Sequence, residues 1–382
     1  MTTLDRVPRI TQGAGLLEKI DTVLDGLVAK GGPVMIVSDP GLRATGRIDA
    51  ASRALKAAGY AVIELEDVKT EPKVEQIDSG AALARRERVA GVIAIGGGSA
   101  MDVGKSIAAT ASGGESISHY VLATKPFPKR TIATVCVPTT SGTGSETTRV
   151  TVASDAAGVK LWFWHDVLKP DLVVLDPVLP TGLPAALTAA TGIDALVHAI
   201  EASTNTNASE MNDTYAHEAI RLVVKHLRRA VSTPGDLAAR AGMQWAATCA
   251  GIAIDNAGTA VAHNIGHALA SLRPVHHGRA VGLAMRATLP WNVATDEGRF
   301  ARVADLMGEG ASAGRLPAAF DRLLREVGVK ISLAGEGHDH VTAQQLAEYM
   351  ARPENAPMRR SNRRPIGDAD LLPLAEAMLG GH

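Results

Sequence analysis

Residues 89–106 read VAGVIAIGGGSAMDVGKS, and this stretch indicates the fold. The continuously apolar run Val89–Ile95 predicts a strand that helices cover on both faces, as in parallel sheets. Gly96–Gly98 follow it directly, and Ser99–Ala111 has the spacing of a helix. A glycine-rich turn between a strand and a helix lets a phosphate approach the helix amides. The turn matches neither GxGxxG nor the P-loop pattern, so alone it is as typical of a tight turn as of a pyrophosphate site.

Short apolar strands alternate with longer helices on either side of this turn. The predicted strands are Pro33–Ser38, Ala61–Leu65, Thr131–Val137 and Leu172–Leu175, and the predicted helices are Arg47–Ala58 and Lys73–Arg88. Such alternation predicts a doubly wound, mostly parallel sheet that binds ligands at the carboxyl ends of its strands.

The pattern changes at Asp176–Pro184, where three prolines and a glycine indicate a hinge. Helical periods dominate after it, at Pro184–Ser203, Asn212–Ala230, Gly235–Asn256, Val261–Ser271, Ala280–Ala294, Arg299–Leu306, Leu316–Glu326, Thr342–Met350 and Asp368–Met378. We therefore predict an α/β dinucleotide-binding domain over residues 1–183 and an all-helical metal-binding and catalytic domain over residues 184–382. The arginine-rich segment Arg352–Arg364 is interpreted as a solvated loop.

Composition excludes several classes of protein. The chain has 382 residues, of which 46% are apolar and 21% charged, with a net charge of −1, so it is neither disordered nor built for nucleic acid or an anionic membrane. Two cysteines, Cys136 and Cys249, do not make a disulfide framework or a zinc finger. No signal peptide or apolar run of about 20 residues is apparent, which predicts a cytoplasmic protein.

A second polar loop, rich in Thr, Ser and Gly, follows the fourth predicted strand at Pro138–Glu146. Two such loops at the carboxyl ends of strands favour a bound nucleotide over solvent-facing turns. Ser99 is expected to cap the helix after the first loop, with Asp102 in its first turn. Asp39 ends the first strand, where a carboxylate accepts from ribose hydroxyls and repels a 2′-phosphate, which favours NAD over NADP.

Several metal-ligating side chains occur at helical spacing in the second half. Asp194 and His198 are four residues apart, His263 and His267 repeat this spacing, and His277 follows in a His-rich turn. Residues four apart share one helix face, and a carboxylate with several imidazoles suits Fe²⁺ or Zn²⁺. The sequence has neither HExxH nor CxxC, which excludes the familiar zinc-protease and structural zinc sites.

The strings GGGSAMDVGKSIA, PTTSGTGSETTRVTVASD, TGIDALVHAIEAS and HNIGHALASLRPVHHG together resemble the iron-containing (group III) alcohol dehydrogenase family in order and spacing. The resemblance covers essentially the whole chain. It implies a metal-dependent, NAD(P)-linked alcohol dehydrogenase or aldehyde reductase that transfers hydride reversibly between a primary alcohol or its carbonyl and nicotinamide, in a cleft between the two domains. It further implies a homodimer or larger homo-oligomer with a small-molecule substrate.

The resemblance also implies roles for individual residues. It assigns the metal, with Fe²⁺ favoured over Zn²⁺, to Asp194, His198, His263 and His277. It assigns NAD binding to Asp39, Gly97, Gly98, Ser99, Thr139, Thr140, Thr143, Lys160 and Leu179. Asp102, in the helix after the glycine turn, is a further candidate for NAD binding. His267 lies near nicotinamide and substrate, where it either relays the hydroxyl proton or orients a ligand.

The sequence departs from the family pattern at three positions. Glu71 replaces an asparagine that precedes proline, which puts one cofactor contact in doubt. Val150 and Ile254 stand where many members carry larger side chains, which predicts a roomier substrate pocket. Arg273 either meets an acidic substrate group or is solvated.

Other activities on the same scaffold stay open. A hydroxyacid–oxoacid transhydrogenase would hold its cofactor tightly, and a maleylacetate-reductase-like enzyme would need no metal. A nucleotide-binding regulatory module without turnover is the alternative from another class. The sequence does not identify the alcohol or the direction of the reaction.

Overall fold

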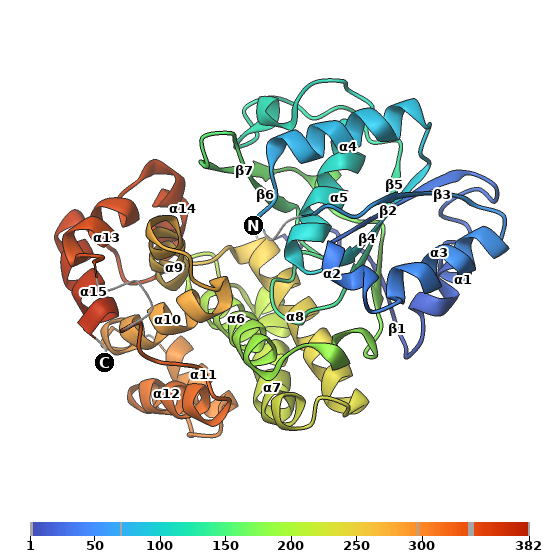
Figure 1. Cartoon of the computed structure of the whole chain (residues 1–382). Coiled ribbons are helices and arrows are strands. Elements are labelled where there is room, and N and C mark those ends of the chain that lie inside the picture. The colour runs from blue at the N-terminus through green and yellow to red at the C-terminus, as the bar shows by residue number, and fades with distance from the viewer. Residues whose placement is uncertain (1–2, 69–70, 296–297, 335–339, 381–382) are drawn as a thin grey trace. The chain divides into compact units, whose positions relative to one another are not determined.

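The structure is a computed structural model that describes residues 3–68, 71–295, 298–334 and 340–380. The chain forms two compact units, one of Arg6–Thr181 and one of Gly182–His382 together with Met1–Asp5. Figure 1 labels their helices and strands.

A six-stranded parallel sheet forms the first unit. Its order is β1 (Arg9–Gln12), β8 (Leu172–Leu175), β5 (Ala133–Pro138), β4 (Gly91–Gly96), β2 (Pro33–Ser38) and β3 (Ala61–Leu65). The chain passes from β2 to β3 on one side and returns to β4 on the other side of β2. The strand order therefore reverses between β2 and β4, and sheets of this kind bind ligands at that point.

Helices cover both faces of this sheet because alternate side chains of a strand point to opposite faces. Val34 and Ile36 of β2 belong to a core cluster that includes side chains of α3 (Arg47–Ala57). Met35 and Val37 belong to a second cluster, with side chains of α4 (Val74–Arg86) and α5 (Gly98–Thr110). In Figure 1, α4 and α5 lie above the sheet and α3 lies below it. The predicted doubly wound sheet is confirmed.

Three strands of the structure were not predicted from the sequence. β1 is short and polar, without an apolar run. β6 (Val150–Ser154) and β7 (Lys160–Trp164) form an antiparallel hairpin, which the α/β pattern does not include. Lys160 pairs with Ser154 across this hairpin.

Among its described residues, the second unit contains helices and no strands. Its helices are α6 (Ala185–Thr204), α7 (Glu210–Ser232), α8 (Leu237–Ala257), α9 (Val261–Leu272), α10 (His277–Val293), α11 (Arg299–Leu306), α12 (Leu316–Glu326), α13 (Ala343–Met350), α14 (Ala356–Ser361) and α15 (Asp368–Gly380). Every residue of α6 from Thr188 to Thr204 is buried, so α6 is the central helix of this unit. Each helix predicted in this half is present.

The interpretation of Arg352–Arg364 as a solvated loop was wrong. The segment contains α14, and Arg363 donates from Nε and Nη2 to the carbonyls of Thr204 and Asn205, at 3.1 and 2.6 Å. Those carbonyls end α6, so the guanidinium lies at the negative end of the helix dipole, where a cation is stabilising.

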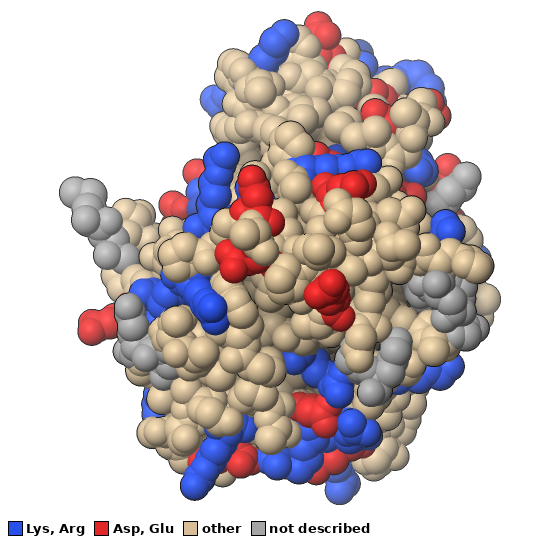
Figure 2. Space-filling view, turned by 90° about the vertical axis from the view of Figure 1, so that its left-hand side faces the viewer, with Lys and Arg blue, Asp and Glu red and all other residues tan. Residues whose placement is uncertain are grey.

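The surface agrees with the balanced composition. On the face drawn in Figure 2, basic and acidic side chains lie close to one another. Among the described residues, no helix is long and apolar enough to cross a bilayer.

Candidate metal centre and nucleotide site

Helix α6 carries three acidic or imidazole side chains on one face. Asp194, His198 and Glu201 are spaced by four and three residues, and all three are buried. In a helix this spacing aligns side chains along one stripe. The spacing of metal-ligating residues predicted the first two but not Glu201, although its position in TGIDALVHAIEAS already placed it on the same stripe.

Helices α9 and α10 bring two more imidazoles to Asp194. Its Oδ1 lies 3.7 Å from His198 Nε2, 3.8 Å from His263 Nε2 and 3.6 Å from His277 Nε2. One ligand atom from each of these four residues lies within 4.8 Å of all the others. Donors bound at about 2.0–2.2 Å to one tetrahedral ion lie about 3.3–3.6 Å apart. The cluster therefore has nearly the dimensions of a four-ligand transition-metal site.

The polar atoms of the cluster support a cation there. Asp194 Oδ1 and His263 Nε2 are buried and have no hydrogen-bond partner. Burial raises the pKa of Asp194, against the opposing effect of His277. Burial also lowers the pKa of His263 well below its usual value, so its imidazole is neutral. Buried polar atoms without partners are costly, and a divalent cation would compensate all of them. The residues present thus fit a metal ion.

Glu201 fixes the orientation of one of these imidazoles. Its Oε2 lies 2.6 Å from His263 Nδ1, and its Oε1 accepts from the backbone amide of Ala262 at 2.7 Å. Burial raises the pKa of Glu201 to about 7, against hydrogen bonds from the start of α9. A proton on Nδ1, shared with this carboxylate, leaves the Nε2 lone pair directed at the cluster.

One further histidine lies next to the four-residue cluster. His267 lies outside the four-residue cluster, with its ring centroid 5.0 Å from that of His277 and 6.0 Å from that of His263.

A Cβ atom on Gly278 would lie 2.2 Å from the carbonyl oxygen of Ala190 on α6. Only a residue without a side chain lets α10 come this close, so Gly278 is what allows His277 to reach Asp194.

In the sheet unit, the two predicted polar loops meet at the carboxyl ends of β4 and β5, next to the reversal of strand order between β2 and β4. A Cβ on Gly98 would lie 2.9 Å from Thr143 Cγ2, and one on Gly97 would lie 3.7 Å from Thr140. The amide of Thr139 donates to Gly96 O at 2.9 Å. The glycine turn and the threonine loop are therefore packed together beside the first turn of α5.

The prediction that Ser99 caps this helix was wrong. The N-cap residue of α5 is Gly97, with no hydrogen bond from a side chain, and Ser99 lies within the first turn. That turn contains no acidic residue, so the prediction that Asp102 lies in it was also wrong. Because the first amides of a helix have no partner within it, this N-terminus is suited to an anionic group.

Asp102 and Lys105 of α5 form hydrogen bonds with the threonine loop and with the start of β6. The carboxylate of Asp102 accepts from Ser145 Oγ at 2.6 Å and from the amide of Val152 at 3.1 Å. Lys105 is completely buried, and its Nζ donates to the carbonyls of Ser145, Thr148 and Val150. Its ammonium group therefore holds the loop together, unlike a P-loop lysine, which reaches a phosphate. Direct contact of Asp102 with a cofactor stays a prediction.

The remaining predicted residues are divided between the two units. Leu179 is 5% exposed in the core on the α3 face of the sheet. Val150 begins β6 in the sheet unit, and Ile254 lies on α8 in the helical unit. Arg273 is exposed just after α9 and donates to Leu272 O at 3.3 Å.

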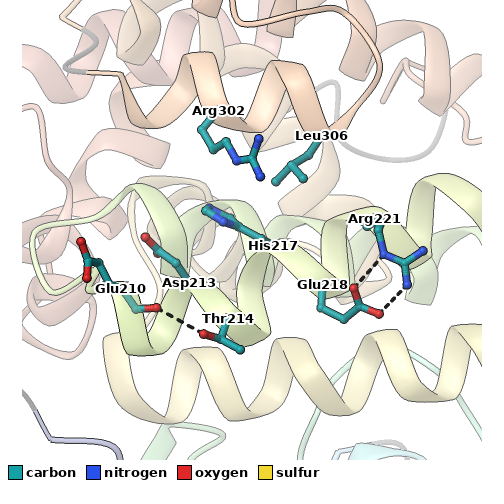
Figure 3. Close-up of a pocket in the computed structure, with 8 residues that line it drawn as sticks. All are labelled: Glu210, Asp213, Thr214, His217, Glu218, Arg221, Arg302 and Leu306. Carbon is teal, nitrogen blue, oxygen red and sulfur yellow. Dashed lines mark hydrogen bonds and ion pairs between the residues drawn. The ribbon is translucent and has the colours of Figure 1, made fainter.

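A surface cavity of about 470 Å³ lies elsewhere in the helical unit (Figure 3). Residues of α7 and α11 line it, including Asp213, His217, Arg221 and Arg302. No predicted site residue is among them, and both of its arginines are paired, Arg221 with Glu218 and Arg302 with Asp305.

The chain matches two family models that adjoin along the sequence. Residues 8–177 match the model described as iron-containing alcohol dehydrogenase, and residues 188–378 match the C-terminal domain of the same family. The chain belongs to the iron-containing alcohol dehydrogenase family. Its enzymes are NAD-linked alcohol dehydrogenases that use iron, so the predicted enzyme class and cofactors are confirmed at the level of the family, and a regulatory module without turnover is not supported.

Named relatives of this iron-containing alcohol dehydrogenase cover most of its length. It is 32% identical to the NAD-dependent methanol dehydrogenase of Bacillus methanolicus, over 85% of this chain and 84% of that protein. It is 32% identical to long-chain-alcohol dehydrogenase 1 of Geobacillus thermodenitrificans, over 97% of this chain and 94% of that protein. A crystal structure of 1,3-propanediol oxidoreductase superposes with a TM-score of 0.90 at 31% identity, over 99% of this chain and 100% of the other.

Proposed function

We propose that this protein oxidises a primary alcohol, or reduces the corresponding aldehyde, with Asp194, His198, His263 and His277 holding Fe²⁺. The observation that carries this proposal is the meeting of three imidazole Nε2 atoms around one buried, otherwise unpartnered oxygen of Asp194. A bound Fe²⁺ supplies a Lewis acid for the alcohol or carbonyl oxygen.

The protein's own side chains orient this centre. Glu201 keeps the proton of His263 on Nδ1 and so keeps Nε2 available. The side chain of His277 is 38% exposed, whereas those of Asp194 and His263 are 2% and 3% exposed. A substrate would therefore reach the cluster from the side of His277.

The proton of the substrate hydroxyl needs an acceptor. We assign this role to His267, because its ring lies beside that of His277 and outside the four-residue cluster. An imidazole has an unperturbed pKa near neutrality, which suits proton transfer in both directions. The alternative is that His267 only orients a neighbouring group; His267→Gln would then change substrate affinity without changing the pH profile of kcat.

The nucleotide is assigned to the reversal of strand order in the sheet. Gly97, Gly98 and Ser99 would offer backbone amides to the pyrophosphate, and Asp39 would accept from ribose hydroxyls. The other residues that we propose to contact NAD are Asp102, Thr139, Thr140, Thr143, Lys160 and Leu179. Glu71 accepts from Ser154 Oγ at 2.6 Å. This hydrogen bond lowers the pKa of Glu71, so a carboxylate stands where many family members carry the neutral amide of an asparagine.

The substrate class is that of primary alcohols. The relatives are named for methanol and for long-chain alcohols, and this range supports a panel of unbranched alcohols of increasing length. Val150 and Ile254 are our candidates for the residues that set the accepted length. We further propose a cytoplasmic homodimer or larger homo-oligomer with a functional boundary at residue 183.

The decisive experiment follows NADH absorbance at 340 nm under anaerobic conditions. Protein, NADH and a panel of aldehydes and oxoacids are mixed with Fe²⁺, with Zn²⁺ or with a chelator. Metal-dependent loss of NADH with aldehydes supports the proposal. Loss that persists with the chelator would favour a maleylacetate-reductase-like enzyme, and exchange between two organic acids without free NADH would favour a transhydrogenase.

A further inference from the structure

Arg43 lies one helical turn after Asp39 but pairs with other carboxylates. It ends the short helix α2 (Pro40–Arg43), of which Asp39 is the N-cap residue. Its Nε lies 2.5 Å from Glu66 Oε2, and its two Nη atoms contact Glu64, Glu66 and Asp49. Three carboxylates therefore occupy the guanidinium, which has only five N–H donors.

Asp39, in contrast, keeps a carboxylate with no hydrogen bond or ion pair to any residue that the structure describes. A Cβ added to Gly41 would lie 3.0 Å from its Oδ1, and one added to Gly96 would lie 3.4 Å from its Oδ2. The carboxylate thus lies between the start of α2 and the glycine turn after β4. This is the edge of the sheet where the strand order reverses.

Of the three acids that hold Arg43, Asp49 lies on α3, and the other two lie on β3 or directly after it, in fixed register with β2. Ile36 of β2 pairs with Glu64 of β3, and Glu66 follows one residue after β3 ends. Glu64 also accepts from Ser52 Oγ at 2.6 Å. Burial opposes ionisation of Glu64, but its hydrogen bonds from Ser52 and Arg43 outweigh burial and lower its pKa. The carboxylate of Glu64 is therefore ionised and fixed in place.

We propose that Glu64 and Glu66 set the selectivity for the cofactor's ribose by holding Arg43 away from Asp39. With Arg43 occupied, Asp39 remains a free acceptor for the two ribose hydroxyls of NAD. A 2′-phosphate would instead meet an anionic edge, because Arg43 is already neutralised by its acids. This inference rests on the nucleotide site proposed above.

The test measures binding rather than turnover. Isothermal titration of the whole protein compares AMP with adenosine 2′,5′-bisphosphate, which differs from AMP only by the 2′-phosphate. The variants are Asp39→Gly, Asp39→Gly with Glu64→Gln and Glu66→Gln, and that triple variant with Arg43→Gln added. Circular dichroism and thermal melting check that each variant is folded.

The triple variant should bind the bisphosphate, relative to AMP, about tenfold more tightly than Asp39→Gly alone, because one charge-assisted hydrogen bond to Arg43 is gained. Adding Arg43→Gln should abolish this gain. If the triple variant gains nothing, or if the gain survives the loss of Arg43, the proposal is wrong.

A matched control removes the same charge from the same unit. Glu75→Gln with Glu87→Gln, made in the Asp39→Gly background, should leave the binding ratio within about twofold, because both acids lie on or after α4 and are screened by solvent. An equal gain in this control would overturn the role of Arg43. If the unmodified protein does not bind AMP, the nucleotide site itself is wrong; if AMP binds and the ratios do not change, only the role of Arg43 fails.

Discussion

Glu201 Oε2 and His263 Nδ1 lie 2.6 Å apart, although the two residues are 62 positions apart in the chain. The same carboxylate accepts from the first amides of α9, so it joins that helix to α6. One side chain thus positions an imidazole and caps the helix that carries it. A displacement of Glu201 would change the metal centre without removing any of its four proposed ligands.

Glu201→Gln should weaken iron binding by about 10–100-fold, the usual effect of losing a hydrogen-bond partner of a metal-ligating histidine. Metal content after dialysis against graded chelator concentrations measures the effect. The control is Glu210→Gln on α7, an exposed acid, which should keep the original affinity. Unchanged iron affinity in Glu201→Gln would contradict the positioning role.

His263→Ala should lower kcat by at least about 100-fold, because it removes a proposed ligand and leaves Glu201 without its partner. His217→Ala is the matched control, since His217 lies in the same unit but lines the surface cavity of Figure 3. Both variants are assayed anaerobically with added Fe²⁺, and their metal content is measured in parallel. Full iron occupancy with normal turnover in His263→Ala would refute the metal centre.

Gly278→Ala should destabilise the protein by about 1–3 kcal/mol, the usual cost of overpacking. Its new methyl group would lie 2.2 Å from Ala190 O, so α10 must move away from α6 and carry His277 with it. The melting temperature and the affinity for iron should therefore both fall. Gly235→Ala is the control, because a Cβ there meets nothing within 4 Å. If the two variants behaved alike, the close approach of the two helices would not limit the site.

The two thiols should not react in the folded protein. Burial raises the pKa of both Cys136 and Cys249 to about 12, and the thiolate is the reactive form. At pH 8 a disulfide reagent should label neither residue until guanidinium unfolds the chain. The variant with both residues changed to alanine should keep its activity; labelling of the native protein, or loss of turnover in this variant, would show that a thiol has a role.

Local patterns predicted most of the elements correctly. The helices of the second half and five strands of the sheet follow from apolar periodicity, which depends on near neighbours alone. Periodicity failed at β1, which is polar, and at the β6–β7 hairpin, which interrupts the expected alternation. It also failed at Arg363, because a charged side chain that donates to distant carbonyls looks the same in sequence as one in solvent.

The amino-acid sequence alone predicted the fold class, the enzyme family and the residue types available for a metal. It placed Asp194 with His198, and His263 with His267, because a helix turns once in about 3.6 residues whatever surrounds it. The tertiary structure places His263 beside Asp194 and His267 outside the cluster, a distinction that the spacing along α9 does not make. It alone paired Glu201 with His263 and Arg43 with Glu64 and Glu66. These contacts join segments whose approach depends on how whole helices and strands pack, and no spacing along the chain encodes that distance.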